Sequence, residues 1–360
     1  MKTHEVIIRR LFLLIPVLLG VSLITFSLSH IFQNPVYSYI PAARAEFTPE
    51  SAINAIIAEH HLDEPVFPNQ YLYYLSDLLK GDWGLSQVAG ASTPVLKAIG
   101  LKFPATLELT LIAVLIAIFA GIPLGIISAV RKDTKVDHVS RVLALSGVSV
   151  PVFWLGLILQ FFFASDNFLN IFPLYCRLDL CKGWPGPTNL VDTTIGGFHL
   201  VIPKTGLYSI DSLLTLNFPL FVETLLHLFL PAFALSWISM ALISRMTRTS
   251  MLEALKQDYI VLARSKGLSE RVVIYKHALR NAMIPTVTIV GLTFAGLLTG
   301  AVLTESIFTW PGLGSWVTQA ILFADSASIQ GFVILAGLIY VTLNLAIDIL
   351  YTVLDPRITL

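Results

Sequence analysis

Six long apolar stretches constrain this 360-residue chain more than any other feature. Each is long enough for a helix that crosses a bilayer, which takes about 20 residues. Hydrophobic residues make up 55% of the chain and charged residues only 13%, too few to cover a soluble fold. The sequence therefore predicts an all-α membrane protein with six transmembrane helices, at 11–31, 105–130, 139–165, 219–243, 284–304 and 329–354. The same composition, with a net charge of zero, excludes a soluble enzyme, a disordered chain and a nucleic-acid binder.

The first stretch has a second interpretation as a cleaved signal peptide. Arg9 and Arg10 precede it, and Ala43-Arg44-Ala45 resembles a cleavage site. Apolar cores of signal peptides run about 7–15 residues, whereas this stretch is longer and the candidate site lies far downstream. A retained membrane helix is favoured.

Basic residues predict the orientation of the chain. With the N-terminus inside, the inner segments hold 16 Lys and Arg and the longer outer segments hold 7. Positive residues accumulate on the cytoplasmic side of membrane proteins. We therefore expect a multi-pass protein of the cell (inner) membrane with both termini in the cytoplasm.

The polar segments complete the domain organisation. Residues 1–31 form the N-terminus and first span, 32–103 an extracytoplasmic cap, and 104–360 the main transmembrane domain. Helices are expected from Thr48-Pro49-Glu50 and over Asn69–Lys80, the second with Leu72, Leu75, Leu78 and Leu79 inward and ending at Gly81. The cap could dock a partner or seal the outer mouth. Its His60-His61 pair points to different helix faces, so no metal site is expected.

The outer loop 166–218 carries both cysteines of the chain, Cys176 and Cys181. They are too few for a disulfide scaffold. They would form one disulfide in an oxidising compartment, and otherwise stay as two free thiols.

The inner segment 244–283 is the most informative polar segment. Apolar residues from Met251 to Leu262 recur at helical spacing up to Gly267, and a second short helix is predicted over Glu270–Ala282. The segment also carries eight basic residues. It could anchor the topology on anionic lipid, or act as a rigid lever for a cytoplasmic partner.

Sequence patterns of catalysis are missing from the chain. It has no Gly-Lys dipeptide, hence no phosphate-binding loop of the G-x-x-x-x-G-K type, and no H-E-x-x-H or G-x-S-x-G motif. We therefore expect a non-enzymatic chain with no cofactor of its own. Any ATP-driven work would require another subunit.

Polar groups inside the spans are candidates for a role in the pathway or in packing, because burying them in lipid is costly. Glu108 and Glu223 could instead complement helix N-termini, and Asn344 and Asp348 could fix helix packing. They do not form the series of carboxylates expected of a proton-coupled carrier. Several spans also contain residues that permit close packing and bending: Gly121, Pro123, Gly125, Gly147, Pro151, Gly291, Gly296 and Gly300.

The chain resembles the permease subunits of binding-protein-dependent ABC importers of the dipeptide, oligopeptide and nickel branch. The resemblance covers nearly the whole length and rests on several blocks in order. They are Arg9-Arg10-Leu11, His61-Leu62-Asp63-Glu64-Pro65, Gly81-Asp82-Trp83-Gly84, Phe103-Pro104-Ala105-Thr106-Leu107-Glu108, Arg245-Met246-Thr247-Arg248, Ala263-Arg264-Ser265-Lys266-Gly267-Leu268, His277-Ala278-Leu279-Arg280, Thr304-Glu305, Trp310-Pro311-Gly312 and Asp355-Pro356-Arg357.

The resemblance implies a type I ABC importer permease fold that forms half of a pathway for di- or oligopeptides. The implied partners are a second permease chain, two ATPase subunits that bind ATP and Mg, an extracytoplasmic substrate-binding protein and membrane lipid. Nickel complexes or oligosaccharides are the alternative cargo, and a stand-alone secondary transporter is the runner-up.

The segment 244–283 is similar to the cytoplasmic "EAA" loop of these permeases, which docks on the ATPase. Where the general pattern has its glutamate and first alanine, this chain has Val261 and Leu262; only Ala263 and Gly267 match. The residues that the resemblance places at the ATPase interface are Asp258, Ala263, Arg264, Lys266, Gly267 and His277. Glu305 joins the pathway or packing candidates.

Overall fold

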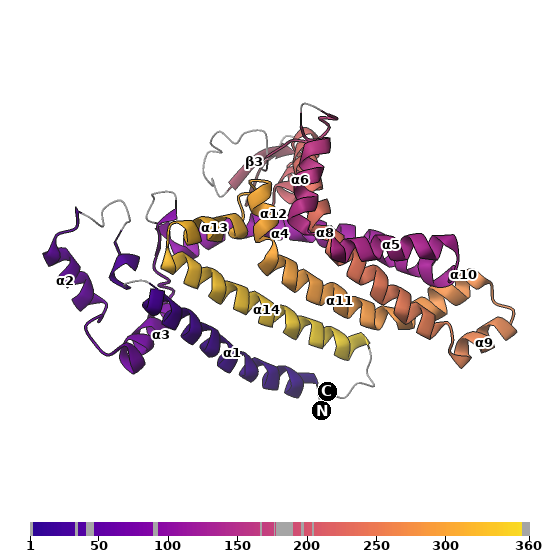
Figure 1. Cartoon of the computed structure of the whole chain (residues 1–360), viewed down its shortest axis with the longest axis horizontal. Coiled ribbons are helices and arrows are strands. Elements are labelled where there is room, and N and C mark those ends of the chain that lie inside the picture. The colour runs from indigo at the N-terminus through magenta and orange to yellow at the C-terminus, as the bar shows by residue number, and fades with distance from the viewer. Residues whose placement is uncertain are drawn as a thin grey trace. The chain divides into compact units, whose positions relative to one another are not determined.

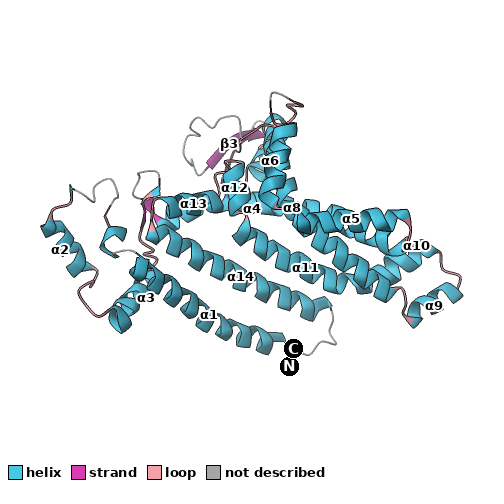
Figure 2. Ribbon diagram, viewed as in Figure 1, coloured by secondary structure: helices cyan, strands magenta, loops and turns pink. Residues whose placement is uncertain are grey.

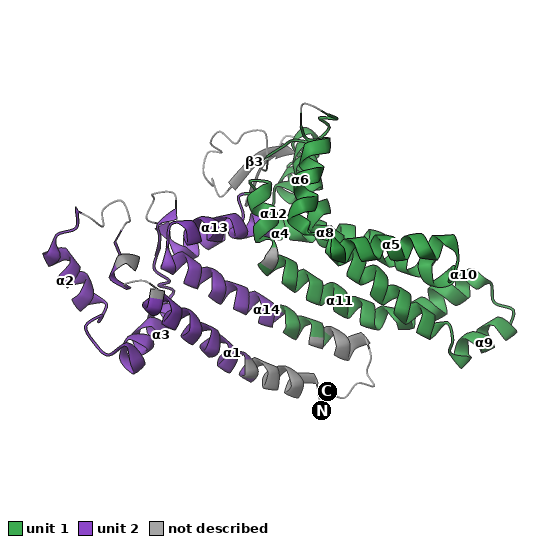
Figure 3. Cartoon of the chain, in the orientation of Figure 1, with its two compact units in different colours: residues 1, 107–310, 343–360 green, residues 2–106, 311–342 purple. Residues whose placement is uncertain are grey.

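The structure is a computed structural model. It describes residues 3–32, 35–40, 47–88, 93–165, 168–175, 177, 190–195, 198–203 and 205–354. Helices dominate this part of the chain, with two small antiparallel hairpins (Figure 2). One hairpin pairs β1 (Leu85–Ser86) with β2 (Thr93–Pro94), and the other pairs β3 (Leu190–Ile195) with β4 (Phe198–Pro203). The chain divides into two compact units, which Figure 3 colours separately.

Unit 2 comprises residues 2–106 and 311–342. A core cluster in it joins Val95 and Ile99 to Leu313, Trp316 and Ala327. Besides the first hairpin, its elements are α1 (Thr3–Phe32), η1 (Pro35–Ser38), α2 (Glu50–Glu59), η3 (Val66–Gln70), α3 (Tyr71–Lys80), the start of α4 (Val95–Val130), α13 (Leu313–Leu322) and the start of α14 (Ser326–Leu354).

The two helices predicted in the cap are present, with differences in detail. α2 begins at Glu50 and is preceded by Pro49, so the expected cap at Thr48 is off by one residue. α3 ends before Gly81, whose φ of +87° is a left-handed conformation that glycine adopts without strain. The inward face of α3 was predicted wrongly in part, because Leu72 and Leu79 are exposed. Tyr71 takes the buried position instead, and its hydroxyl lies 2.9 Å from that of Ser22 on α1.

Unit 1 contains residues 107–310 and 343–360. The long helix α8 runs through it, and α5, α6 and α11 pack against α8 (Figure 1). The short helix α7 also contacts α8. With the rest of α4, the second hairpin and the end of α14, its elements are α5 (Lys135–Ser149), α6 (Val152–Phe163), α7 (Tyr208–Leu214), α8 (Phe218–Ala254), α9 (Asp258–Ser265), α10 (Glu270–Val272), η5 (Val273–Ala278), α11 (Leu279–Gly300) and α12 (Val302–Ile307).

Small residues set the distance between α8 and its neighbours, as the glycine pattern predicts. A Cβ atom at Gly125 of α4 would lie 2.6 Å from the Cβ of Thr247, and one at Gly147 of α5 would lie 2.4 Å from the Cβ of Ala241. Both distances are shorter than two carbon atoms permit. Close packing of α4 and α5 on α8 therefore requires glycine at these two positions.

Five helices among the described residues are long and apolar enough to cross a membrane: α1, α4, α8, the helical run from Glu270 into α11, and α14. The remaining predicted span, 139–165, is not one helix. It contains most of α5 and all of α6, and these two helices meet at 105°. Pro151 has no N–H to donate and disfavours helical geometry at Val150, which is extended with ψ of 121°. A count of six spans requires this bent pair to cross as one.

Candidate functional site

The predicted inner segment folds around α9, a short helix at one end of unit 1 (Figure 1). Ile260 and Ala263 point from α9 into a core cluster and are almost fully buried. The cluster also contains Ile126 of α4, Met251 of α8 and Val273 of η5. Since these residues come from four helices, α9 is packed against the ends of α4 and α8 and against η5.

The opposite side of α9 is exposed. Val261 and Leu262 each retain 57% of their surface, and Tyr259 retains 36%. Asp258 and Arg264 are exposed on the same helix, and the exposed Lys266 follows it directly. Aliphatic side chains on a packed helix usually turn inward, so an outward apolar face with charges beside it is typical of an interaction surface.

Gly267 ends this element, as the sequence predicts. Its φ is +76°, a left-handed conformation, and its N–H donates to the carbonyl of Arg264. A Cβ atom at Gly267 would meet nothing within 4 Å, so the restriction is conformational and not steric. The second predicted helix is present but does not end at Ala282: α10, η5 and α11 follow one another without a break from Glu270 to Gly300, so it continues into the next predicted span. His277 lies in η5 and is half-buried.

An ion pair spans the turn at Gly267. The Nη2 atom of Arg264 lies 2.6 Å from Oε1 of Glu270, and this hydrogen bond raises the pKa of the Arg264 guanidinium. Both side chains are about half exposed, so the pair contributes little to stability in water. It does restrain the direction in which α10 leaves α9.

Asp137 is a buried charge in unit 1 that the sequence interpretation did not select. Its side chain has no exposed surface and accepts two hydrogen bonds from Arg248 of α8, at 2.9 and 3.0 Å. Ser128 Oγ and the backbone N–H of Asp133 donate to the same carboxylate, at 2.6 and 3.0 Å. The Nη2 atom of Arg141 lies 3.6 Å from Oδ2 of Asp137. This cluster joins the end of α4, the following turn and α5 to α8.

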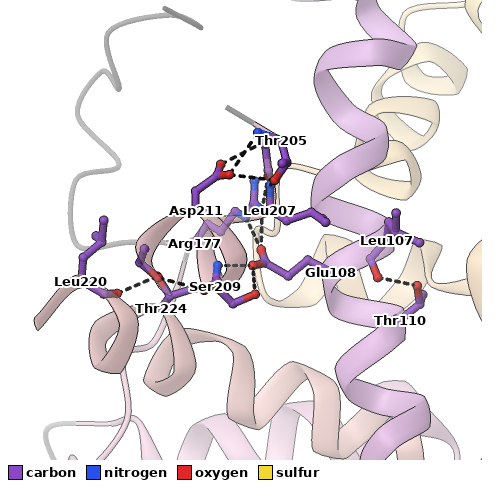
Figure 4. Close-up of polar contacts among 12 residues, drawn as sticks. Leu107, Glu108, Thr110, Arg177, Thr205, Leu207, Ser209, Asp211, Leu220 and Thr224 are labelled. Carbon is purple, nitrogen blue, oxygen red and sulfur yellow. Dashed lines mark hydrogen bonds and ion pairs between the residues drawn. The ribbon is translucent and has the colours of Figure 1, made fainter. Parts of the chain in front are cut away.

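Glu108 is the centre of a second buried cluster in unit 1 (Figure 4). Its Oε1 accepts from both the N–H and the Oγ of Ser209, each at 2.6 Å. Its Oε2 pairs with Arg177, whose Nε lies 3.0 Å away and whose Nη2 also donates to it. Such a carboxylate is a fixed anchor between α4 and α7, and each of its oxygens is already engaged.

Arg177 is held from several sides. Its Nη2 donates to the carbonyl of Gly206 at 2.6 Å, and its guanidinium carbon lies 3.7 Å from the ring centre of Tyr208. The buried ring of Trp310 lies 5.8 Å away. Arginine over aromatic faces is a favourable cation–π arrangement. The Glu108 cluster thus fastens two parts of the predicted outer loop to the transmembrane helix α4.

The other predicted polar residues do not gather into one site. Glu305 is fully buried in α12, while Glu223 is half-buried in α8, where its backbone carbonyl contacts Nδ1 of His227 at 2.9 Å. Asn344 is half-buried in α14. The side chain of Asp348 and both Cys176 and Cys181 lie outside the described residues. The proposed disulfide therefore stays a prediction, and so do the pathway roles.

The functional residues that sequence reasoning missed share one property. Asp137, Arg177 and Ser209 lie in segments interpreted as loops or span ends, and each takes its role from a partner far along the chain. The only local signal was at Asp137, an acid in the first turn of α5 where the helix dipole favours it.

Comparison with known proteins gives the family. Residues 121–360 match the model of the binding-protein-dependent transport system inner membrane component. The chain is 41% identical to the dipeptide transport system permease protein DppB of Alkalihalophilus pseudofirmus, over 97% of this chain and 98% of the relative. It is 39% identical to the probable D,D-dipeptide transport system permease protein DdpB of Escherichia coli, over 96% and 94%.

An oligopeptide relative is also similar over nearly its whole length. The oligopeptide transport system permease protein AppB of Bacillus subtilis is 34% identical, over 98% of each chain. The five apolar helices agree with a multi-pass membrane protein. The chain therefore belongs to the family of binding-protein-dependent transport system inner membrane components.

Proposed function

We propose that this chain is a permease subunit of an ATP-driven peptide importer and that α9 is its docking element for an ATPase subunit. The relatives named as dipeptide and oligopeptide permeases support the cargo class. The observation that carries the docking role is the two-sided character of α9: Ile260 is fully buried, while Val261 and Leu262 are exposed.

The proposed assembly contains a second permease chain, two ATPase subunits and a substrate-binding protein. ATP and Mg bind to the ATPase subunits and not to this chain. The orientation with both termini in the cytoplasm, the extracytoplasmic position of the cap, and lipid contact of the apolar helices belong to the same proposal.

Movement of the ATPase subunits would be transmitted to the membrane helices through α9. A helix that is packed into the ends of α4, α8 and η5 cannot move alone, because its buried side chains are shared with those elements. When ATP brings the ATPase subunits together, displacement of α9 would tilt α8 and α11 with it. Each state of the pathway must then be favoured by different contacts at the ATPase and at the binding protein.

The residues at the interface divide into two roles. Asp258, Arg264 and Lys266 are exposed and available for contact, and Gly267 sets the turn behind them. Ala263 is buried, so its part would be to seat α9 on the cluster. His277 is half-buried in η5, two elements after α9, so a substitution there would affect the movement of η5 more than contact with the ATPase.

The decisive experiment is a pull-down of tagged chain in mild detergent, with ATPase activity assayed on the recovered complex. Leu262→Asp should abolish recovery of the ATPase, since a charge would replace the apolar contact. Lys132→Asp, an exposed change on the α4–α5 turn, is the matched control and should leave recovery intact. An isolated chain that imports solute without any ATPase would instead establish a secondary transporter.

A further inference from the structure

A pocket lies within unit 2, in the predicted cap. It is lined by the end of α1, Pro35 and Tyr39, the turn after α2, α3, the segment before β1 and the start of α14. Seven of its sixteen lining residues carry aromatic rings, and two carboxylates, Asp77 and Asp82, are among the others. The aromatic wall considered below is formed by the rings of Phe26, Tyr39, His60, Tyr73, Tyr74 and Trp83.

The aromatic walls are built by stacking. The ring of Tyr39 lies 3.7 Å from that of His60, at 16° to it. Tyr73 stacks on His61 at 4.1 Å, and Tyr74 lies 5.3 Å from Phe26. These contacts hold flat ring faces around a common space that none of the rings fills.

The pocket is electronegative. Burial raises the pKa of Tyr39 to about 12, and the charges of Asp77 and Asp82 add to this effect. Both carboxylates therefore act on the wall that Tyr39 forms, and its phenol stays neutral at physiological pH. No Lys or Arg is among the residues that line the pocket. Its two histidines are His60, which stacks on Tyr39, and His30, which contacts Gln70 Oε1 at 3.0 Å.

The carboxylates of Asp77 and Asp82 remain accessible to a ligand. Oδ1 of Asp82 accepts the N–H of Gly84 at 3.1 Å, and Asp82 is otherwise exposed. Asp77 pairs with Lys80 at 3.2 Å, but both side chains are exposed, at 41% and 68%. Such a surface pair is weak and can be displaced by a better-placed cation.

We propose that this pocket binds the α-ammonium group of a peptide. Organic ammonium groups are attracted to the faces of Trp, Tyr and Phe rings, and nearby carboxylates add charge attraction. No set of His, Cys, Asp and Glu suited to a metal ion occurs among the described residues, which favours an organic cation over a metal. The inference rests on the proposed function in one respect, namely that the cargo is a peptide.

The test measures equilibrium binding of radiolabelled dialanine to the full-length chain in mild detergent, without the binding protein. N-acetyl-dialanine, which has no ammonium group, should bind at least about tenfold more weakly, a loss of about 1.4 kcal/mol. The double variant Asp77→Asn with Asp82→Asn should lose a similar factor. Asp63→Asn, an exposed carboxylate of the cap outside the pocket, is the matched control and should bind normally.

Substitutions in the aromatic wall provide a second, independent test that leaves the charge of the pocket unchanged. Tyr39→Leu should weaken dialanine binding several-fold, whereas Tyr39→Phe keeps the ring and should bind as the wild type does. Should the double carboxylate variant fail to fold, displacement of dialanine from the wild type by ethylamine tests the same chemistry. Ethylamine should compete, and ethanol at the same concentration should not.

Three results would overturn the pocket assignment: no dialanine binding by the wild type, equal binding of the acetylated peptide, or an equal loss in Asp63→Asn. Peptide uptake by the reconstituted transporter separates this from the proposed function. If the transporter imports peptide but the pocket binds none, the pocket assignment is wrong and the proposed function stands. If the transporter imports no peptide with the ATPase subunits and the binding protein present, the proposed function is wrong.

Discussion

Asp137 and Arg248, 111 residues apart in the chain, face each other through two hydrogen bonds of 2.9 and 3.0 Å, one to each carboxylate oxygen. Arg248 lies on α8 one turn before Met251, which is fully buried against the base of α9. The ion pair thus fixes the part of α8 from which the proposed docking element follows. A bidentate pair of this kind fixes direction as well as distance.

Asp137→Asn is expected to lower stability by about 3 kcal/mol, because it removes a buried charge partner and leaves Arg248 uncompensated. The measurement is the thermal unfolding midpoint of the purified full-length chain. Asp133→Asn, on the same turn with a 70% exposed side chain, should leave the midpoint unchanged.

A double-mutant cycle separates this pair from general damage to the region. Arg248→Gln should cost less in the Asp137→Asn background than in the wild type, since the partner is already gone. Purely additive losses would show that the two residues do not stabilise each other. If the pair also positions α9, Asp137→Asn should raise the number of ATP molecules hydrolysed per peptide imported.

Gly125→Leu is expected to disrupt the packing of α4 on α8. Even a Cβ atom at this position would lie 2.7 Å from the carbonyl oxygen of Ser244, which cannot move without bending α8. We expect a loss of about 1–3 kcal/mol or more, measured as reduced recovery of folded chain and a lower unfolding midpoint.

Gly296→Ala is the matched control for Gly125. It also lies inside a helix, α11, but a Cβ there meets nothing within 4 Å. Alanine should therefore be tolerated. If Gly125→Leu and Gly296→Ala behave alike, the close approach of α4 and α8 is not what selects glycine.

The sequence was sufficient for the elements that depend on local chemistry. The five apolar helices, the end of α3 at Gly81 and the turn at Gly267 follow from hydropathy and glycine placement. The break between α5 and α6 was only partly foreseen: Pro151 indicated bending, but a turn of 105° depends on how both halves pack. Leu72 and Leu79 were wrongly predicted to face inward, because Tyr71, which is hydrogen-bonded to Ser22 of α1, occupies the buried face of α3.

The candidate sites were less accessible to prediction, since their charges pair across long separations. Glu108 was selected as a buried carboxylate, yet its partner Arg177 lies 69 residues away in a loop without recognisable periodicity. A single sequence contains no signal for such a pair. The resemblance of the 244–283 segment to a known loop was the better guide there, although it could not show that Ala263 faces inward.

Gly267→Val is expected to uncouple ATP hydrolysis from import while the chain still inserts in the membrane. A left-handed φ of +76° costs a β-branched residue about 1–2 kcal/mol or more, so α9 and α10 would change their relative direction. The measurement is peptide uptake and ATP hydrolysis by the same reconstituted transporter. Gly267→Asn is the matched control, because asparagine tolerates this conformation; equal uptake by the valine variant and the wild type would remove Gly267 from the coupling element.

Glu108→Gln is expected to loosen the predicted outer loop from α4. The change leaves the Arg177 guanidinium buried without a counter-charge, whereas Ser209→Ala removes only one neutral donor from the same carboxylate. The first should cost about 3 kcal/mol and the second about 1 kcal/mol. Unfolding midpoints of the two variants test this order, and an additional Arg177→Met change should recover part of the loss in Glu108→Gln but not in Ser209→Ala. If Ser209→Ala proves the more damaging change, the hydroxyl and not the ion pair holds α7 against α4.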